Sequence, residues 1–238
     1  MDRPTHVPLR LAIIDASPAP SDGSIAHLLA DFEEALRVYE HYSAWAVPDA
    51  EGIYGQNEDG TRKGLPIEHV RWPEHGGCTP SEGESAPLSA CDSILLGFMV
   101  EDADPPEPVL ERFGRATRSH ELGSGSRVYA IAVTDAYDAG CVLPTYERLE
   151  QLCDAGGLVW SGGLAVGGGT LVPEQAGTAR MGGKRRTRSE GTDVVIAAVR
   201  SGADVSRFSR DGESIVMARC PMPRCAYDRR VRRRYSPR

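Results

Sequence analysis

Apolar runs of strand length alternate with amphipathic segments along this chain, and this alternation restricts the fold more than any other feature. The clear strand-like runs are 9–14, Ser93–Val100, Arg127–Thr134 and Leu158–Val166. Each is apolar almost throughout, as is typical of parallel strands that are covered on both faces. Strands that alternate with helices of about 10 to 15 residues form right-handed βαβ units. The chain is therefore predicted to be an α/β protein with a doubly wound parallel sheet.

The helices between these strands are predicted from apolar residues spaced three and four apart. Ser24 stands near the N-cap of the first helix. Strand, loop and helix together take about thirty residues, as a βαβ unit requires. The apolar face of this helix comprises Ile25, Leu28, Leu29, Phe32 and Leu36. Further helices are predicted at Val109–Arg118, Pro144–Cys153 and Asp193–Phe208. Pro108 suits the first turn of the helix that it precedes.

Two regions are less regular. Proline, glycine and acidic residues interrupt every pattern over about 48–90, which we interpret as an irregular insertion. The second strand of the sheet is predicted near 42–47 or, alternatively, 67–72. Residues 184–188 have the composition of a basic loop. We therefore expect one domain over 1–209, followed by a helical, basic C-terminal tail over 210–238.

Charge is distributed unevenly between the two ends. From Arg180 onward there are sixteen Lys and Arg against six Asp and Glu, a net charge of +10. The whole chain has 27 Lys and Arg and 34 Asp and Glu. The part before Arg180 therefore has eleven basic and twenty-eight acidic residues, a net charge of −17. The arginine-rich end could contact nucleic acid or an anionic membrane surface. We favour the alternative that it lies in solvent or along an acidic surface of its own or a neighbouring subunit.

Composition is that of an ordinary globular protein, with 40% hydrophobic residues. No apolar run approaches the roughly 18 residues of a membrane span, and the first ten residues do not resemble a signal peptide. A cytoplasmic protein is the expectation. The six cysteines form no CxxC pair, so we expect no metal site and mostly structural, reduced thiols.

The segment 152–169, LCDAGGLVWSGGLAVGGG, joins the end of a helix to a strand and then to three glycines. Only glycine adopts positive φ or admits close backbone approach without steric cost. The triplet is therefore interpreted either as a tight turn that leaves the sheet or as a place where a ligand approaches.

Three loops follow the carboxyl ends of the predicted strands, where doubly wound sheets bind their ligands. They are 16–24, 97–105 and 135–140. The first has serine hydroxyls and opens into a helix N-terminus, which suits a phosphate group. Tyr137, in the third, is the best candidate to stack on a ligand, because a loop aromatic has less packing reason to be there.

These loops resemble those of the flavodoxin-like NAD(P)H-dependent FMN reductases. Ala16, Ser17, Pro18 and Ala19 are similar to the first loop of that family, with Ser21 and Ser24 as the small polar residues that follow. Gly97, Phe98, Met99 and Val100 are similar to its second loop. Segment 152–169 is the most similar of all, and the likeness extends over roughly 9–209.

This resemblance implies a flavodoxin-like sheet of five parallel strands in the order 2-1-3-4-5. It further implies an FMN-binding, NAD(P)H-dependent oxidoreductase or electron-transfer flavoprotein that acts on a small-molecule electron acceptor, as a homodimer. The implied cofactor-binding residues are Ser17, Pro18, Ser21, Ser24, Gly97, Phe98, Met99, Val100, Thr134, Tyr137 and Gly140; no catalytic residue is assigned.

An alternative follows from the charges of the same loops. Asp22, Glu101 and Asp102 place carboxylates where a phosphate dianion and an electron-rich ring would lie, and like charges repel at short range. The alternative is a non-catalytic flavodoxin-like module that has lost FMN and serves as a binding or interaction protein.

Overall fold

The computed structural model describes residues 10–17, 23–46, 65–72, 87–101 and 105–235. In this part of the chain six parallel strands form one sheet in the order β2-β1-β3-β4-β5-β6. The strands are β1 (Leu11–Asp15), β2 (Ile67–Arg71), β3 (Ser93–Val100), β4 (Arg127–Thr134), β5 (Val159–Val166) and β6 (Ile215–Ala218). The expected order of the first five is confirmed, but the expected number of strands was wrong. The sixth strand has only four residues, too few for its hydrophobic pattern to stand out in the sequence.

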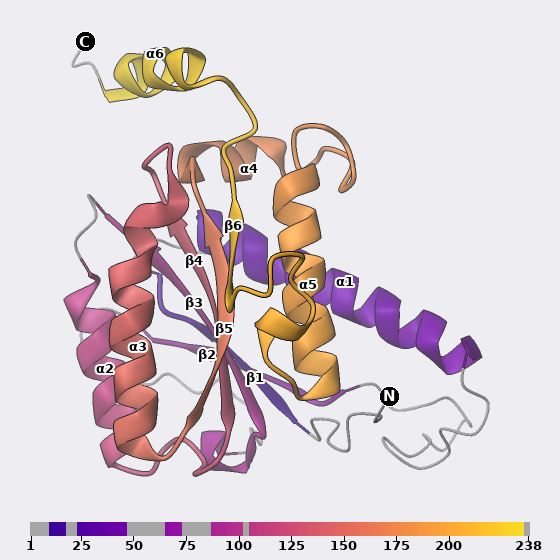
Figure 1. The fold of residues 1–238 in the computed structure, drawn as a ribbon, viewed down its shortest axis with the longest axis vertical. Coiled ribbons are helices and arrows are strands. Elements are labelled where there is room, and N and C mark those ends of the chain that lie inside the picture. Colours follow the sequence, from indigo (N-terminus) through magenta and orange to yellow (C-terminus); the bar gives the residue numbers. More distant parts are fainter. Residues whose placement is uncertain (1–9, 18–22, 47–64, 73–86, 102–104, 236–238) are drawn as a thin grey trace.

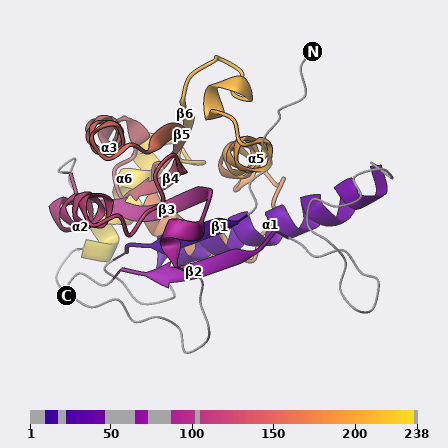
Figure 2. The ribbon, with the colours of Figure 1, turned by 90° about the horizontal axis from the view of Figure 1, so that it is seen from below.

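Helices cover both faces of the sheet (Figures 1 and 2). The helices of the described residues are α1 (Ser24–Ala46), α2 (Glu107–Arg118), α3 (Leu143–Gly156), α4 (Val172–Gln175), α5 (Arg186–Ser201) and α6 (Arg224–Tyr235). In the view of Figure 2, α2 and α3 lie on one side of the sheet and α1 and α5 on the other. Short 3-10 turns precede several of them, among them η3 (Gly169–Leu171) before α4.

Each face of the sheet has its own hydrophobic core. Leu96 and Phe98 of β3 pack against α2 and α3, where Phe113 of α2 joins the same core. Leu95 and Ile131 pack in the other core, against α1 and α5. This division follows from the two-residue repeat of a strand, which sends successive side chains to opposite faces. Because both faces are covered, the strands are apolar throughout rather than alternating, as the sequence indicated.

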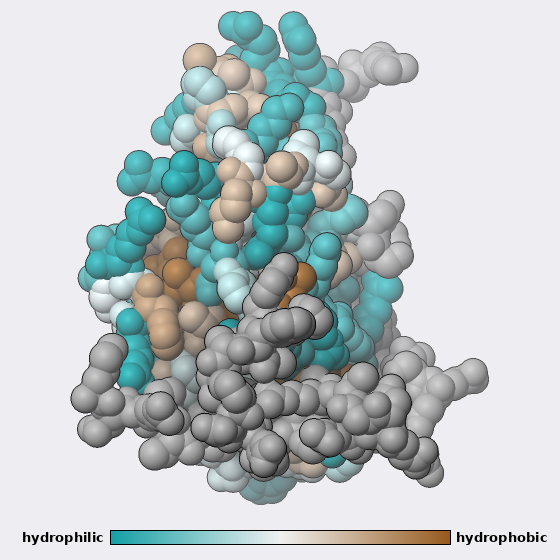
Figure 3. Space-filling view, turned by 90° about the vertical axis from the view of Figure 1, so that its right-hand side faces the viewer, coloured by the Kyte–Doolittle hydropathy of each residue, from teal (hydrophilic) through white to brown (hydrophobic). Residues whose placement is uncertain are grey.

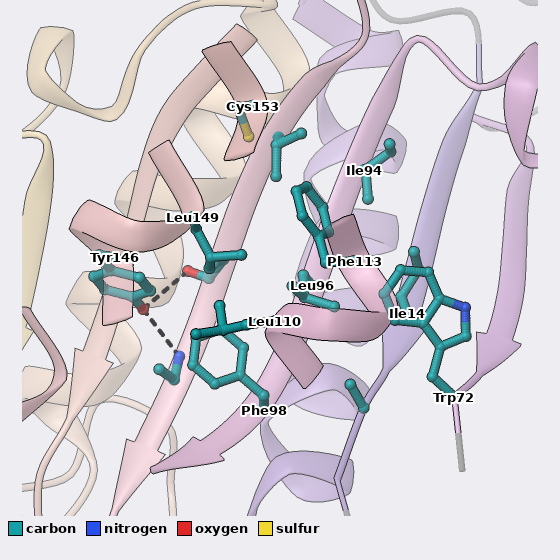
Figure 4. Packing of buried hydrophobic residues seen from close by; sticks show 14 of the residues in the cluster. Ile14, Trp72, Ile94, Leu96, Phe98, Leu110, Phe113, Tyr146, Leu149 and Cys153 are labelled. Carbon is teal, nitrogen blue, oxygen red and sulfur yellow. Dashed lines mark hydrogen bonds between the residues drawn. The ribbon is translucent and has the colours of Figure 1, made fainter. Parts of the chain in front are cut away.

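Tyr146 of α3 places a polar group in the core that the sheet forms with α2 and α3 (Figure 4). Its hydroxyl accepts a hydrogen bond from the amide of Ala132 at 3.0 Å and donates to the carbonyl of Leu164 at 2.6 Å. Burial raises the pKa of this phenol far above its ordinary value. The hydroxyl therefore stays neutral and ties α3 to the sheet.

Figure 3 shows the side of the molecule that lies on the right in Figure 1, and its described surface is mostly hydrophilic, with hydrophobic residues in smaller areas between. Within the described part of the chain, no helix combines the length and the apolar composition that crossing a membrane requires.

Three local expectations differ from the structure. Residues 42–46 extend α1, so the second strand is the alternative at Ile67–Arg71. The expected basic loop at 184–188 instead contains the start of α5. The helix that was expected to continue to Phe208 ends at Ser201, because Gly202 adopts a left-handed conformation as its cap (φ 56°).

Buried charges explain why α5 begins so early. Arg185 and Arg188 are 8% and 6% exposed, and Arg185 donates to the carboxylate of Asp31 on α1 at 2.6 Å. Arg188 reaches the side-chain oxygen of Gln175 at 3.3 Å. Burial, with the nearby Arg185, lowers the pKa of Arg188 to about 10. Arginine composition alone suggests a solvated loop, and the sequence gives no sign that a carboxylate on α1 will draw these side chains inward.

Candidate functional site

The carboxyl edge of the sheet has a topological switch point between β1 and β3. These strands are neighbours, but the chain leaves β1 for α1 on one face and β3 for α2 on the other (Figure 2). Such divergence opens a crevice in which doubly wound sheets bind ligands. The amide of Ala16 donates to the carbonyl of Gly97 at 2.8 Å and fixes the two strand ends together. A ligand site was expected at this edge from the positions of the three loops.

Asp15, at the end of β1, controls the first loop and was not recognised from the sequence. Its Oδ1 accepts hydrogen bonds from both the amide and the hydroxyl of Ser17, at 2.9 and 2.6 Å. Both donors of Ser17 are therefore directed at a carboxylate rather than at the crevice. An aspartate two residues before a serine was a possible signal, because aspartate side chains often accept bonds from amides two residues on.

The N-terminus of α1 lies beside the same loop. Ser24 is buried, and its hydroxyl donates to the carbonyl of Gly169 at 2.8 Å. That bond joins the first turn of α1 to the turn after β5. The amides of the first helical turn, including those of Ile25 and Ala26, have no acceptor within the helix. They supply the positive end of a 23-residue helix at the switch point.

The candidate residues of the second loop lie largely in the core. Phe98 and Val100 are 0% exposed, and Phe98 packs edge-on against Tyr146 with ring centroids 6.1 Å apart. A Cβ on Gly97 would lie 2.8 and 2.9 Å from side-chain carbons of Leu29 and Ile25, so its small size accommodates α1. Met99 is partly buried and packs against the α1 and α5 core.

Two candidate residues of the third loop, Thr134 and Gly140, bond to other residues of the same turn. The hydroxyl of Thr134 accepts a bond from the amide of Ala136 at 3.1 Å, and the thiol of Cys141 lies 3.4 Å from it. The amide of Gly140 donates to the carboxylate of Asp138 at 3.0 Å. These bonds shape the turn between β4 and α3. Pro18 and Ser21 lie outside the described residues.

Tyr137 is held by the C-terminal segment, which crosses the carboxyl edge above β4 and β5 (Figure 1). Its hydroxyl donates to the carbonyl of Met222 at 3.1 Å, and its ring lies 5.8 Å from the ring of Tyr227. Arg224 lies 5.9 Å above the Tyr137 ring. The aromatic group expected to stack on a ligand therefore packs against α6 instead.

The glycine triplet at 167–169 serves close packing at this edge. A Cβ on Gly167 would lie 2.6 Å from the carbonyl oxygen of Tyr137, and one on Gly169 would lie 2.6 Å from Val133. Gly168 has φ 71°, and a Cβ there would lie 2.9 Å from the sulfur of Cys220. Of the two interpretations of the triplet, the tight turn accounts for these contacts.

The structure thus brings Ser17, Ser24 and Gly97 to the switch point and separates Tyr137 from them by placing it under α6. The partners of these groups, namely Asp15, Gly169, Met222 and Tyr227, were not predicted from the sequence. Among the described residues, no three His, Cys, Asp or Glu side chains gather closely enough to hold a metal ion.

Comparison with solved structures gives distant structural neighbours, of which the Trp repressor binding protein of Bacillus subtilis is an example. That protein aligns with 70% of this chain and 98% of its own, at 15% sequence identity and a TM-score of 0.40. No family model and no curated protein matches the chain.

The described thiols should differ sharply in reactivity. Burial raises the pKa of Cys91 to about 11 and that of Cys153 to about 12, so neither forms appreciable thiolate at pH 8. Cys225 on α6 is exposed. We expect a disulfide reagent at pH 8 to label Cys225 within minutes, and Cys91 and Cys153 only after denaturation. Peptide mass mapping over time checks this, and early labelling of Cys153 would contradict the packing of α3.

Proposed function

We propose that this chain is a flavodoxin-like protein that binds FMN at the switch point between β1 and β3 and uses it for electron transfer. The observation that carries the proposal is the first turn of α1 beside the Ala16–Gly97 contact. A long helix whose first amides lack helical acceptors attracts a phosphate dianion through both its hydrogen-bond donors and its dipole. The ligand would bind in the crevice, and the positive N-terminal end of α1 would attract its phosphate.

The described residues fit the phosphate of FMN better than its ring. Backbone amides of Ile25 and Ala26 are suitable donors, and the bond from Ser24 to Gly169 fixes the turn that presents them. When bound, FMN would supply a ring that accepts and releases one or two electrons. The protein's part would be to bind the phosphate and to place the ring at the sheet edge. In the proposed function NAD(P)H is the reductant, a small molecule is the electron acceptor, and the protein is a homodimer.

Asp15 should oppose flavin binding, because it adds a negative charge near the phosphate and occupies both donors of Ser17. Asp15→Asn is therefore expected to tighten FMN by about 1 kcal/mol at low salt, and the gain should shrink as salt screens the charge. Riboflavin, which lacks the phosphate, should gain little. Visible absorbance titrations with both flavins measure the difference.

Asp204→Asn is the matched control for this experiment. It removes the same charge at the other end of the sheet, where Asp204 pairs with Arg127 at the start of β4. FMN affinity should not change in that variant. If Asp15→Asn weakens FMN, the carboxylate contacts the ligand or holds Ser17 in a binding geometry, and the repulsion argument fails.

A second candidate function is the binding module without a flavin. The contacts of Tyr137 with Met222 and Tyr227, and those of Ser17 with Asp15, favour it, because groups expected to hold FMN already have partners within the chain. A purified protein that stays colourless after incubation with FMN would support this function instead.

A further inference from the structure

A concave cavity of about 710 Å³ lies between α6 and the segment that begins at η3, outside the switch point. The polar groups that line it are Thr170, Glu174, Arg229, Arg230 and Arg233. Its size falls within the range of small-molecule sites, about 300 to 1,000 Å³. α6 lies along the upper edge of the molecule in Figure 1, over the ends of the strands and beside α4.

α6 is anchored, so the cavity has a fixed wall. The Tyr227 hydroxyl donates to the carbonyl of Asp135 at 2.5 Å, and the Tyr137 hydroxyl holds the carbonyl of Met222. Tyr227 is 2% exposed and packs in a small apolar cluster with Leu171 and Cys220. The arginines on the neighbouring positions of the helix are therefore presented from a rigid element, which lowers the entropic cost of binding.

The cavity is positively charged. Arg230 forms an ion pair with Glu174 across it. Arg229 and Arg233 have no carboxylate partner within the described part of the chain. Three guanidinium groups against one carboxylate leave an excess of two positive charges.

We propose that this cavity binds the phosphate group of a small phosphorylated ligand, as a second site separate from the switch point. Arg229 and Arg233 are four residues apart and so lie on one face of α6, in reach of the same anion. Their planar guanidinium groups match phosphate oxygens in a bidentate manner that lysine cannot reproduce. Every basic residue after position 184 is arginine, consistent with that geometry. The Thr170 hydroxyl, 3.3 Å from that of Tyr227, adds a neutral polar group to the wall.

Calorimetric titration of the full chain at low ionic strength tests this site. Inorganic phosphate serves as the free anion and AMP as a phosphate ester, so the two titrations show which kind of ligand binds. We expect saturable binding of at least one. Arg229→Ala with Arg233→Ala should weaken it about tenfold or more, from the loss of two charge-assisted contacts. The matched control is Arg219→Ala with Arg232→Ala, which removes the same charge from positions that do not line the cavity. That control should change affinity less than about twofold.

Two results would overturn the proposal. One is the absence of saturable binding of either probe at millimolar concentration. The other is an equal loss of phosphate or AMP affinity in both double variants, which would indicate attraction by net charge alone. Tighter binding of a short DNA duplex, with equal losses of affinity in both double variants, would indicate the same.

FMN affinity, measured by visible absorbance, should be unchanged in Arg229→Ala with Arg233→Ala. An equal fall of FMN and AMP affinity in this variant would mean that the two sites are one. Because phosphate and AMP contain no flavin, the cavity can bind them even if the chain binds no FMN, so the two proposals fail separately.

Discussion

Gly162→Ala is expected to destabilise the protein by about 2 to 5 kcal/mol, a large part of the usual stability of a domain. Gly162 has φ 98°, and a Cβ there would lie 2.2 Å from the backbone oxygen of Ser214 and 2.9 Å from Val205. The register of β4 with β5 shifts here, since Val128 pairs with Trp160 but Tyr129 with Gly162. The substitution therefore strains the backbone and pushes away the segment that enters β6.

Gly125→Ala separates these two effects. Gly125 also has positive φ, 80°, but no atom lies within 4 Å of its added Cβ. Backbone strain alone should cost about 1 to 2 kcal/mol. Urea unfolding of both variants gives the comparison. Equal losses would mean that Ser214 and Val205 do not pack against Gly162 as described.

Asp31→Asn is expected to cost about 3 to 5 kcal/mol, because it leaves the buried guanidinium of Arg185 without a carboxylate. The Oδ1 of Asp31 lies 2.6 Å from Arg185 and 3.3 Å from Arg180. Arg180 keeps a second partner, Asp193, at 2.7 Å. The main loss therefore falls on Arg185, and with it on the junction between α1 and the start of α5.

An exposed ion pair provides the comparison for this prediction. Asp204 lies 2.9 Å from Arg127, but its side chain is 56% exposed. Asp204→Asn should cost less than about 1 kcal/mol. Thermal and urea unfolding measure both variants, and a similar small loss from Asp31→Asn would show that Arg185 reaches water or another acceptor.

Strand composition and helical periodicity were sufficient to predict most of the fold. Ser93–Val100 and Arg127–Thr134 are strands with the predicted bounds, because a strand covered on both faces must be apolar throughout. The start of α1 at Ser24 was also predicted, from its apolar spacing. These patterns of apolar residues are local, so they do not depend on contacts with distant parts of the chain.

Features that depend on distant partners could not be predicted. Strand β6 has four residues and is recognisable only by its pairing with Gly163–Val166. Arg185 and Arg188 look like loop residues until Asp31 is placed beside them.

The same reason limits the candidate site. Its position at the carboxyl edge followed from the order of elements, and Ser17, Ser24 and Gly97 do lie there. The sequence did not show that Ser17, Ser24 and Tyr137 already have hydrogen-bond partners. Those partners, Asp15, Gly169 and Met222, come close to them only in the folded chain. Tyr137 was predicted to face a ligand, yet it contacts a helix more than eighty residues later in the sequence.

A backbone-amide NMR titration with FMN tests the central claim most directly, since it reports where the phosphate binds. We expect saturable shifts at Ser17, Ile25 and Ala26 at lower FMN concentrations than any shift at Arg229 and Arg233 of α6. Saturable shifts confined to α6 would place FMN in the arginine-lined cavity instead. No saturable shift at the first turn of α1 would contradict the proposal that this chain binds FMN at the switch point.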